Sequence, residues 1–562
     1  NDEQSIAMSF YRPAGVDNNI VRFKVFHRDT LVELSDVVPV LEHLGLRVVG
    51  EQPYKIQESS GREIYLHDFY LRFNLKTDIV MQAVKEHFQQ AFEAIWLKHT
   101  DSDAFNRLVL GARLDWREVA VLRVYARYMK QTAFNFSQSY IADTLANHLD
   151  ITRNLVALFK SKFDPKVNKG SVKELQRIER LHRKIIDSLE QVQSLNEDQV
   201  IRRYVEMIEG TLRTNFFRKN EAGENRDFIS LKLAPRNIDN IPEPRPLFEI
   251  FVYSPRVEGV HLRGGKVARG GLRWSDRLQD YRTEVLGLVK AQQVKNAVIV
   301  PSGAKGGFVA KQLPSASNRE QFMAEGVACY QIFIRGLLDV TDNLHDGELV
   351  PPPQVVRLDE DDPYLVVAAD KGTATFSDIA NAISQDYNYW LGDAFASGGS
   401  QGYDHKAMGI TARGAWVSVQ RHFKEMGMNI QREDFSVIGI GDMAGDVFGN
   451  GMLLSEHICL IAAFNHQHIF IDPNPNSAAS FNERKRLFQI SRSTWQDYDN
   501  KIISSGGGVF SRSAKSIAIT PAMRKRFAID AKVLSPNELL TALLLAPVDL
   551  IWNGGIGTYV KG

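Results

Sequence analysis

Positive charges and glycines are concentrated between residues 269 and 307, in a stretch where a small acid could bind. Arg269 precedes a pair of glycines, and Lys305 lies between glycines in the motif GAKGG. Because glycine lets a ligand or a neighbouring backbone approach closely, we expect these two cations near a binding site. The plainer interpretation is a solvated basic helix followed by an ordinary turn, but a solvated lysine does not need glycines around it.

A helix is predicted between these two glycine motifs. Ser275 or Asp276 can cap it, and apolar side chains recur at spacings of three and four. Gln292 and Lys295 share the apolar face, which a solvated lysine would avoid. The apolar run 297–300 then predicts a buried strand that delivers the GAKGG motif on a loop at its end.

A carboxylate follows another predicted strand. The apolar run Leu365 to Ala369 ends at Asp370, just before a Gly/Thr turn. Ligands in open α/β sheets bind beyond the carboxyl ends of strands, so Asp370 could donate or accept a proton there. The alternative is that Asp370 only caps the turn, and both interpretations remain open on these residues alone.

The last third of the chain contains a glycine fingerprint directly after an apolar strand. Gly439, Gly441 and Ala444 fit the pattern G-x-G-x-x-A and open a predicted helix from Val447 to Leu454. The first glycine permits a tight turn, the second lets a pyrophosphate approach, and the small third residue lets helix and strand pack. The pattern predicts a dinucleotide site, with a purely structural glycine turn as the alternative.

An acid for the ribose of such a dinucleotide is predicted at Asp472. This residue ends the apolar strand HIFIDP. A carboxylate that accepts from the ribose hydroxyls favours NAD over NADP. The separation from Gly439 is longer than the usual ~20 residues.

Composition limits the remaining classes of function. The 562 residues are 44% apolar and 24% charged, with a net charge of +1, which argues against nucleic acids and membrane surfaces as partners. No apolar run approaches the ~20 residues of a membrane helix. Two cysteines, Cys329 and Cys459, indicate a reducing compartment, so a cytoplasmic location is expected. The fourteen histidines show no metal-binding spacing, so no metal site is predicted.

The chain is predicted to contain several domains of α+β and α/β type. Residues 1–100 are expected to form a ferredoxin-like module, and residues 101–224 a helical region. Residues 225–400 and 401–562 alternate strands with helices, which is typical of parallel α/β sheets. Within the first module we predict a strand at 21–26, a helix at 31–44, strands at 46–56 and 63–73, and a helix at 77–96.

Taken together, these motifs resemble the glutamate dehydrogenase family, and most of all its large bacterial NAD-specific type. The resemblance is specific over about residues 245–562. It implies that Lys305 is the catalytic lysine of a G-x-K-G-G loop and that Asp370 is the catalytic aspartate. It also implies that Gln292 and Lys295 hold the α-carboxylate of the substrate. The two last regions would then be a substrate domain and a Rossmann NAD-binding domain.

The resemblance also predicts the cofactor contact and the choice of substrate. Thr411 in ITARG matches a threonine that contacts the cofactor from a T-x-R-G turn. Smaller relatives carry a lysine at the position of Arg269, and enzymes for leucine or phenylalanine carry an apolar residue there. Because an arginine fork binds a carboxylate in two places, a dicarboxylic substrate is expected.

The implied reaction is the oxidative deamination of L-glutamate to 2-oxoglutarate and ammonia, with NAD as the hydride acceptor. Lys305 would activate the attacking water, and Asp370 would exchange protons with the nitrogen. The alternatives are another NAD-dependent amino-acid dehydrogenase and a regulatory protein with a degenerate dehydrogenase fold. Retention of Lys295, Lys305, Asp370 and the glycine turn together argues against the second alternative.

The N-terminal module resembles an ACT-type regulatory domain. An amino-acid effector could bind there, although a structural module for assembly into a homo-oligomer is an equal alternative. The chain starts without Met and stops shortly after a predicted strand. We therefore expect a fragment of a longer protein, which by itself lacks the last substrate contacts of the family and is expected to be inactive.

Overall fold

The computed structural model divides the chain into two compact units, Asn1–Gln401 and Gly402–Gly562, and each is described by itself. None of the helices among the described residues is long and apolar enough to cross a lipid bilayer. At 291–295 and 405 the description covers the backbone only. The structure describes residues 6–28, 32–57, 63–73, 80–295, 302–370, 372–373, 375–402 and 404–555.

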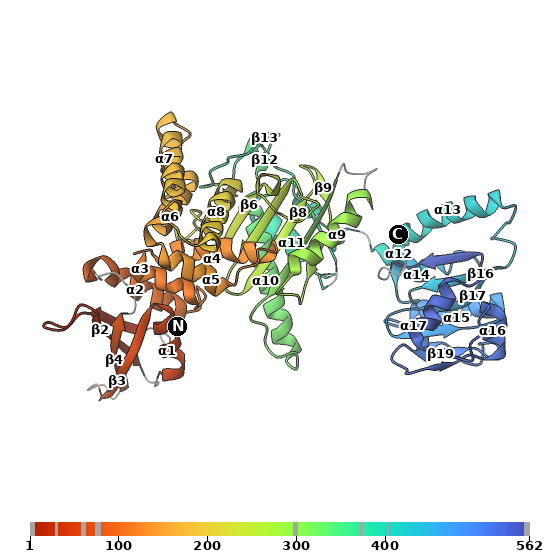
Figure 1. Ribbon diagram of the computed structural model, residues 1–562. Coiled ribbons are helices and arrows are strands. Elements are labelled where there is room, and N and C mark those ends of the chain that lie inside the picture. Colours follow the sequence, from red (N-terminus) through yellow and green to blue (C-terminus); the bar gives the residue numbers. More distant parts are fainter. Residues whose placement is uncertain are drawn as a thin grey trace. The chain divides into compact units, whose positions relative to one another are not determined.

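The first unit begins with an antiparallel sheet that packs two helices against one face (Figure 1). The core between them is aromatic, and the rings of Phe10 and Phe88 stack with centroids 4.0 Å apart. The strands and helices predicted from residue 21 onward are confirmed, whereas β1 was not predicted. In the sheet order β1-β2-β4-β3, the strands are β1 (Ile6–Tyr11), β2 (Ile20–Arg28), β4 (Glu63–Phe73) and β3 (Leu46–Gln57), and the helices are α1 (Leu34–His43) and α2 (Met81–Trp96).

A helical region follows, as predicted. Ser171 accepts a hydrogen bond from the Glu174 amide and closes a capping box, which fixes the start of the long helix α7. Helix α4 is buried along most of its length because other helices and a sheet surround it. The helices are α3 (Leu108–Gly111), α4 (Trp116–Gln131), α5 (Gln138–Asn147), α6 (Leu149–Phe163), α7 (Val172–Leu189) and α8 (Leu195–Gly210).

Among the described residues, the main sheet of the first unit has seven strands and is largely antiparallel, whereas β9 and β10 run parallel to β11. The prediction of a parallel sheet is wrong here, because β6 and β7 pair antiparallel and a short turn joins β7 to β8, whereas parallel strands need long crossovers. The strands are β5 (Thr211–Thr214), β6 (Ile229–Leu233), β7 (Phe248–Tyr253), β8 (Val257–Arg263), β9 (Ala268–Arg269), β10 (Leu272–Trp274) and β11 (Ser302–Ala310).

Helices cover both faces of this sheet. Helix α9 (Tyr281–Lys295) shares a core with the helical region on one face. Helices α10 (Arg319–Leu338) and α11 (Ser377–Asp386) share a second core on the other face. Short strands β12 (Asn343–His345), β13 (Glu348–Val350), β14 (Val367–Ala368) and β15 (Ala396–Ser397) complete the unit.

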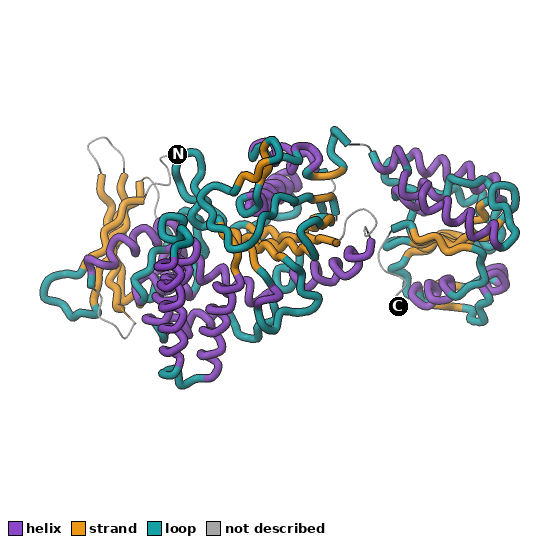
Figure 2. Tube along the Cα trace, turned by 90° about the horizontal axis from the view of Figure 1, so that it is seen from above, coloured by secondary structure: helices purple, strands orange, loops and turns teal. Residues whose placement is uncertain are grey.

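The second unit contains a five-stranded mixed sheet with helices on both faces (Figure 2). Strands β16, β17 and β22 run parallel to one another. Strand β18 is antiparallel to both of its neighbours, β17 and β19. The predicted all-parallel pattern is therefore correct only for part of this sheet. In sheet order the strands are β19 (Gly508–Ser511), β18 (His468–Ile471), β17 (Ile458–Phe464), β16 (Phe435–Ile440) and β22 (Leu550–Asn553), and the helices include α13 (Ile410–Glu425), α14 (Asp446–Gly451), α15 (Ser477–Gln489), α16 (Pro521–Phe527) and α17 (Pro536–Leu544).

Three buried cations of the main sheet pair with three buried aspartates of the segment 342–362. We call this set the buried ion network. Burial lowers the pKa of Lys232, whereas Arg263 and Lys232 overcome the effect of burial and lower the pKa of Asp362 to about 2. The pairs are Arg213–Asp342 at 2.9 Å, Arg213–Asp359 at 2.5 Å, Lys232–Asp359 at 2.5 Å, Lys232–Asp362 at 2.6 Å, and Arg263–Asp362.

A second buried pair fixes the start of α9. Arg282 holds Glu249 of β7 through two hydrogen bonds of 2.7 and 2.8 Å, and the two side chains are 1% and 0% exposed. Gln131, the last residue of α4, accepts from the Arg282 amide at 3.2 Å and donates to the Leu278 carbonyl at 3.1 Å. The helical region therefore holds the first turn of α9 directly.

Replacing Arg282 by leucine should destabilise the first unit strongly. The substitution leaves the Glu249 carboxylate buried without its charged partner, which typically costs about 3–5 kcal/mol. We expect this loss in the free energy of unfolding, measured by urea denaturation followed by circular dichroism.

The matched control is Arg277→Ala, just before the same helix. Arg277 pairs with Asp280, but these side chains are 48% and 46% exposed, and an ion pair so open to solvent adds little to stability. Similar losses for both variants would show that the buried pair does not fix α9.

Candidate active site

Lys305 lies inside strand β11, not on a loop as predicted. Its side chain is buried, and the glycines that follow it allow neighbours to pack closely rather than a ligand to approach. A Cβ atom on Gly306 would lie 2.3 Å from the Leu272 side chain, and one on Gly307 would lie 2.6 Å from Val285. The strand predicted at 297–300 lies outside the described residues.

Asp370 follows β14, at the strand end where it was predicted. Its Oδ2 atom is 2.5 Å from Lys305 Nζ and 3.1 Å from Arg273 Nε. Its backbone amide donates to the Thr373 hydroxyl at 3.0 Å, which closes the Gly/Thr turn. The structure therefore brings the predicted lysine and aspartate into contact, with a second cation on the same carboxylate oxygen.

Arg273 is a site residue that the sequence analysis missed. Its Nη1 atom is 3.0 Å from Glu284 Oε1, and the Ser275 hydroxyl donates to the other oxygen of Glu284 at 2.6 Å. Although burial acts in the opposite direction, hydrogen bonds to Glu284 and Asp370 raise the pKa of Arg273. Ser275 is thus occupied by Glu284 and does not cap α9, which begins only at Tyr281.

The pair of glycines after Arg269 brings this segment against both β11 and Asp370. A Cβ atom on Gly270 would lie 1.4 Å from the Ala304 carbonyl oxygen, and one on Gly271 would lie 3.2 Å from Asp370 Cβ. Arg269 itself is half-buried on β9 and lies beside Gly303 of β11. Within the described part of the chain, its guanidinium has no ion-pair partner.

For three further predicted residues, the structure gives the place in a helix but no contact that tests the predicted role. Gln292 and Lys295 belong to the last turn of α9, where only the backbone is described, so their side chains lie outside the described residues. Thr411 is exposed in the first turn of helix α13. The prediction that ITARG forms a turn is wrong, because Gly409, with φ of +61°, precedes the helix and Ile410 begins it.

The glycine fingerprint of the second unit forms a tight connection between β16 and α14. A Cβ atom on Gly439 would lie 2.3 Å from the Phe448 ring, and Gly441 has φ of +145° against the same ring. The Ala444 carbonyl accepts from Lys406 Nζ at 2.9 Å. Helix α14 spans Asp446–Gly451 and is shorter than predicted.

The structure does not bring Asp472 to this fingerprint. Strand β18 runs antiparallel to β17, so the Asp472 amide donates to Ile461, in the middle of β17, at 2.9 Å. The side chain is fully buried and accepts from the Ser504 amide at 3.1 Å. The prediction of a ribose acid at this position is therefore wrong, because it assumed that HIFIDP runs in the direction of the strand before it.

A different acid lies at the fingerprint. The Gly441 amide donates to the Phe464 carbonyl at 2.8 Å, so the turn meets the carboxyl end of the neighbouring parallel strand β17. Asn465, the next residue, donates from Nδ2 to the half-buried Asp442 carboxylate at 2.9 Å. The carboxyl ends of β16 and β17 therefore present one carboxylate beside the glycine turn, where open α/β sheets bind their ligands.

The described residues hold no group of three His, Cys, Asp or Glu side chains that could bind a metal ion. The contact between Lys305 and Asp370 could support acid–base chemistry, and the glycine turn of the second unit has the sequence pattern of a dinucleotide site.

Comparison with known families defines the class. Residues 184–562 match the family described as bacterial NAD-glutamate dehydrogenase, catalytic domain. Residues 100–165 match helical motif 3 of glutamate dehydrogenase, and residues 5–84 match its ACT3 domain. The chain therefore belongs to the bacterial NAD-specific glutamate dehydrogenases, and the ACT-type resemblance of its first module is confirmed.

Individual similar proteins support the same family assignment. The NAD-specific glutamate dehydrogenase of Halomonas elongata is 60% identical over 556 residues, which is 99% of this chain and 34% of that protein. The enzyme of the same name from Pseudomonas aeruginosa is 60% identical over 563 residues, 100% of this chain and 35% of that protein. That of Mycobacterium tuberculosis is 52% identical over 94% of this chain and 34% of that protein. The chain spans about a third of the length of these curated relatives.

Proposed function

We propose that this chain carries the catalytic part of an enzyme that oxidises L-glutamate to 2-oxoglutarate and ammonia with NAD. The observation that carries the proposal is the contact between the buried Lys305 and the partly exposed Asp370, with 2.5 Å between Nζ and Oδ2. Acid–base catalysis requires such groups within hydrogen-bond reach of each other and of the substrate. Membership of the family and the names of the relatives support the same reaction.

Two proton transfers are assigned to this pair. Lys305 activates the water that attacks the 2-imino carbon, and Asp370 gives a proton to the departing nitrogen. Arg273 acts through Asp370: it holds the same carboxylate oxygen from the other side and is itself anchored on Glu284. Arg273 is therefore a positioning residue. When bound, NAD would supply the acceptor for the hydride from Cα of glutamate.

The substrate carboxylates are assigned to the cations of the same unit. Arg269 holds the distal carboxylate, because this half-buried residue of β9 lies beside Gly303, two residues before Lys305 on β11, and its side chain is not tied to a described acid. Gln292 and Lys295 hold the α-carboxylate, in line with the resemblance and with their place in the last turn of α9.

A Rossmann-type NAD site is assigned to the second unit. The residues present fit the cofactor, because Gly439 and Gly441 leave no side chain at the turn and Ala444 is small. Thr411 is kept as a cofactor contact on the family resemblance. Asp442 takes the role of the ribose acid, since Asn465 holds its carboxylate at the end of β17, the strand end from which such acids usually act.

The proposal extends to location and assembly. Both cysteines, Cys329 and Cys459, are free thiols, which supports a cytoplasmic protein. The ACT3 match supports an amino-acid effector at the first module, and a homo-oligomer is the assembly proposed.

Lys305→Ala should lower kcat at least ~10²-fold, the usual contribution of a general acid–base group. Binding of NAD should remain nearly unchanged, because the glycine turn belongs to the other unit. NADH formation measured at saturating glutamate tests this in the intact protein. The control is Lys290→Ala, an exposed lysine of α9, which should leave kcat nearly unaltered. Near-normal turnover in the Lys305 variant would remove this lysine from the mechanism.

Arg269→Leu tests the choice of substrate. A distal carboxylate that loses its charged partner typically costs about 2–5 kcal/mol, which predicts roughly 30-fold or more loss of kcat/KM for glutamate. Norvaline has no distal carboxylate and should lose far less. Equal losses for glutamate and norvaline would place Arg269 outside the substrate pocket and favour a dehydrogenase for a different side chain.

Asp442→Asn tests the choice of cofactor. A carboxylate beside the 2′-phosphate of NADP is repelled, and removing its charge should raise kcat/KM with NADP relative to NAD by about tenfold or more. Asp472→Asn is the control, because this buried carboxyl lies in the middle of the sheet and should leave the NAD/NADP ratio unaltered. An unchanged ratio in the Asp442 variant would rule out this role.

A further inference from the structure

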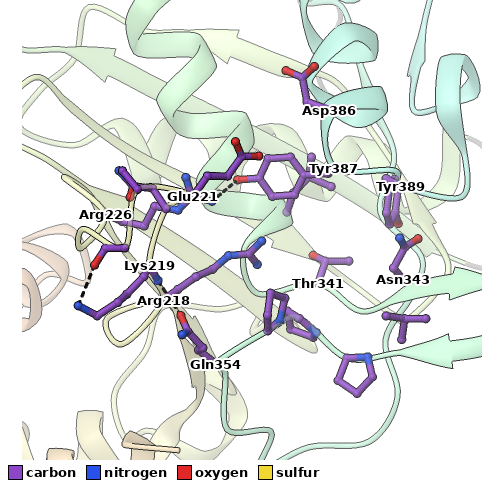
Figure 3. Close-up of a pocket in the computed structure, with 18 residues that line it drawn as sticks. Arg218, Lys219, Glu221, Arg226, Thr341, Asn343, Gln354, Asp386, Tyr387 and Tyr389 are labelled. Atoms are coloured by element: carbon purple, nitrogen blue, oxygen red, sulfur yellow. Dashed lines mark hydrogen bonds between the residues drawn. The ribbon is translucent and has the colours of Figure 1, made fainter.

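A pocket of about 920 Å³ lies in the first unit, and its walls include none of the candidate active-site residues. Four segments form it: the turn at 218–226, the carboxyl end of α10, the proline-rich segment 350–354 and the end of α11 (Figure 3). Its volume lies within the range of 300–1,000 Å³ that small-molecule sites usually have.

Two arginines in this pocket share one buried carboxylate. Asp339 is fully buried, and its Oδ1 atom is 3.2 Å from Arg218 Nε and 3.4 Å from Arg226 Nη2. The Tyr387 hydroxyl donates to the same oxygen at 2.8 Å, and Asn215 donates to the other oxygen at 2.9 Å. One negative charge thus faces two positive charges, so this wall keeps an excess positive charge.

Some donor groups of these two arginines lack a protein acceptor within the residues that the structure describes. Arg218 contacts Asp339 through Nε and Nη1, so that among the described residues its Nη2 has no protein acceptor. Arg226 Nε is buried without any hydrogen-bond partner in the described part of the chain. An unsatisfied donor of this kind costs about 1–3 kcal/mol, and the oxygen atoms of an anion can satisfy guanidinium donors in pairs.

The remaining walls select a particular kind of anion. Three consecutive prolines, Pro351 to Pro353, and the ring of Tyr387 give rigid apolar surfaces. Two exposed acids, Glu221 and Asp386, also belong to the lining, and in Figure 3 the Asp386 carboxylate points away from Arg218. These acids disfavour a ligand with many negative charges, whereas a single acidic group on an apolar body meets the arginines at one end and the rings at the other.

We propose that this pocket binds a small organic anion with one carboxylate or phosphate group and an apolar, ring-shaped body. Arg218 and Arg226 hold the acidic group, and Pro351 to Pro353 and Tyr387 contact the body. Because the pocket shares no residue with the catalytic cluster, the proposal does not depend on the reaction proposed above.

The test is isothermal titration calorimetry on the intact protein with four probes: 2-naphthoate, 2-naphthyl phosphate, uncharged 2-naphthol and inorganic phosphate. At least one naphthyl anion should bind ten times more tightly than both 2-naphthol and inorganic phosphate. The naphthyl anion that binds more tightly identifies the acidic group as carboxylate or phosphate. Equal binding of 2-naphthol and the anions, or no binding of either anion at 1 mM (about 4 kcal/mol of affinity), would overturn the proposal.

Variants assign the binding to these residues. Arg218→Gln should weaken the naphthyl anion about 30-fold, whereas Lys219→Ala should have little effect, because Lys219 Nζ donates to the Gly223 carbonyl on the turn. Glu221→Gln removes a negative charge from an exposed position and should tighten binding of the anion without disturbing the fold. Unchanged affinity in both the Arg218 and the Glu221 variants would place any bound anion elsewhere.

Discussion

The buried ion network constrains the rest of the first unit. Its cations lie on strands β5, β6 and β8 of one sheet, and its aspartates lie on a single segment that leads into β14. A buried charge without its partner is far more costly than a broken surface pair, so this segment has essentially one place to lie. Asp370 follows this segment, so the fixed position of the segment also limits where Asp370 can lie relative to Lys305. Polar groups far from the reacting atoms therefore fix the geometry of the proposed acid–base pair.

Close backbone packing around β11 also helps to fix the position of Asp370. The ARGG segment fits between β11 and Asp370 only because Gly270 and Gly271 have no side chains. On the other side, Arg273 holds the aspartate and is itself anchored on Glu284 of α9. The start of α9 is in turn held by Glu249 and the helical region. Each group of the proposed acid–base pair is thus held by neighbouring protein groups, which keeps the proposed geometry preformed.

Local patterns in the sequence predicted the elements well but not their relative directions. The helices of residues 101–210 and the strand before Asp370 follow from periodicity, and the structure contains them. Asp472 was misplaced because the apolar pattern of a strand does not show which way the strand runs in the sheet. Only the pairing with β17 shows that β18 is antiparallel. Arg273 was missed because its partner Asp370 is 97 residues away in the sequence and its partner Glu284 lies on a separate helix. The loop predicted at Lys305 is a strand, since glycines there serve packing between strands.

The apolar core of the first unit extends across the boundaries between the matched sequence families. One continuous cluster of buried side chains runs from Phe10 of the ACT-type module through the helical region to Val309 of β11. The catalytic family begins at residue 184, in the middle of helix α7. A piece excised there would expose the faces of β7 and α9 that α4 covers. The three regions therefore share one interior, and replacing any one of them would require the apolar contacts of the other two to be refitted.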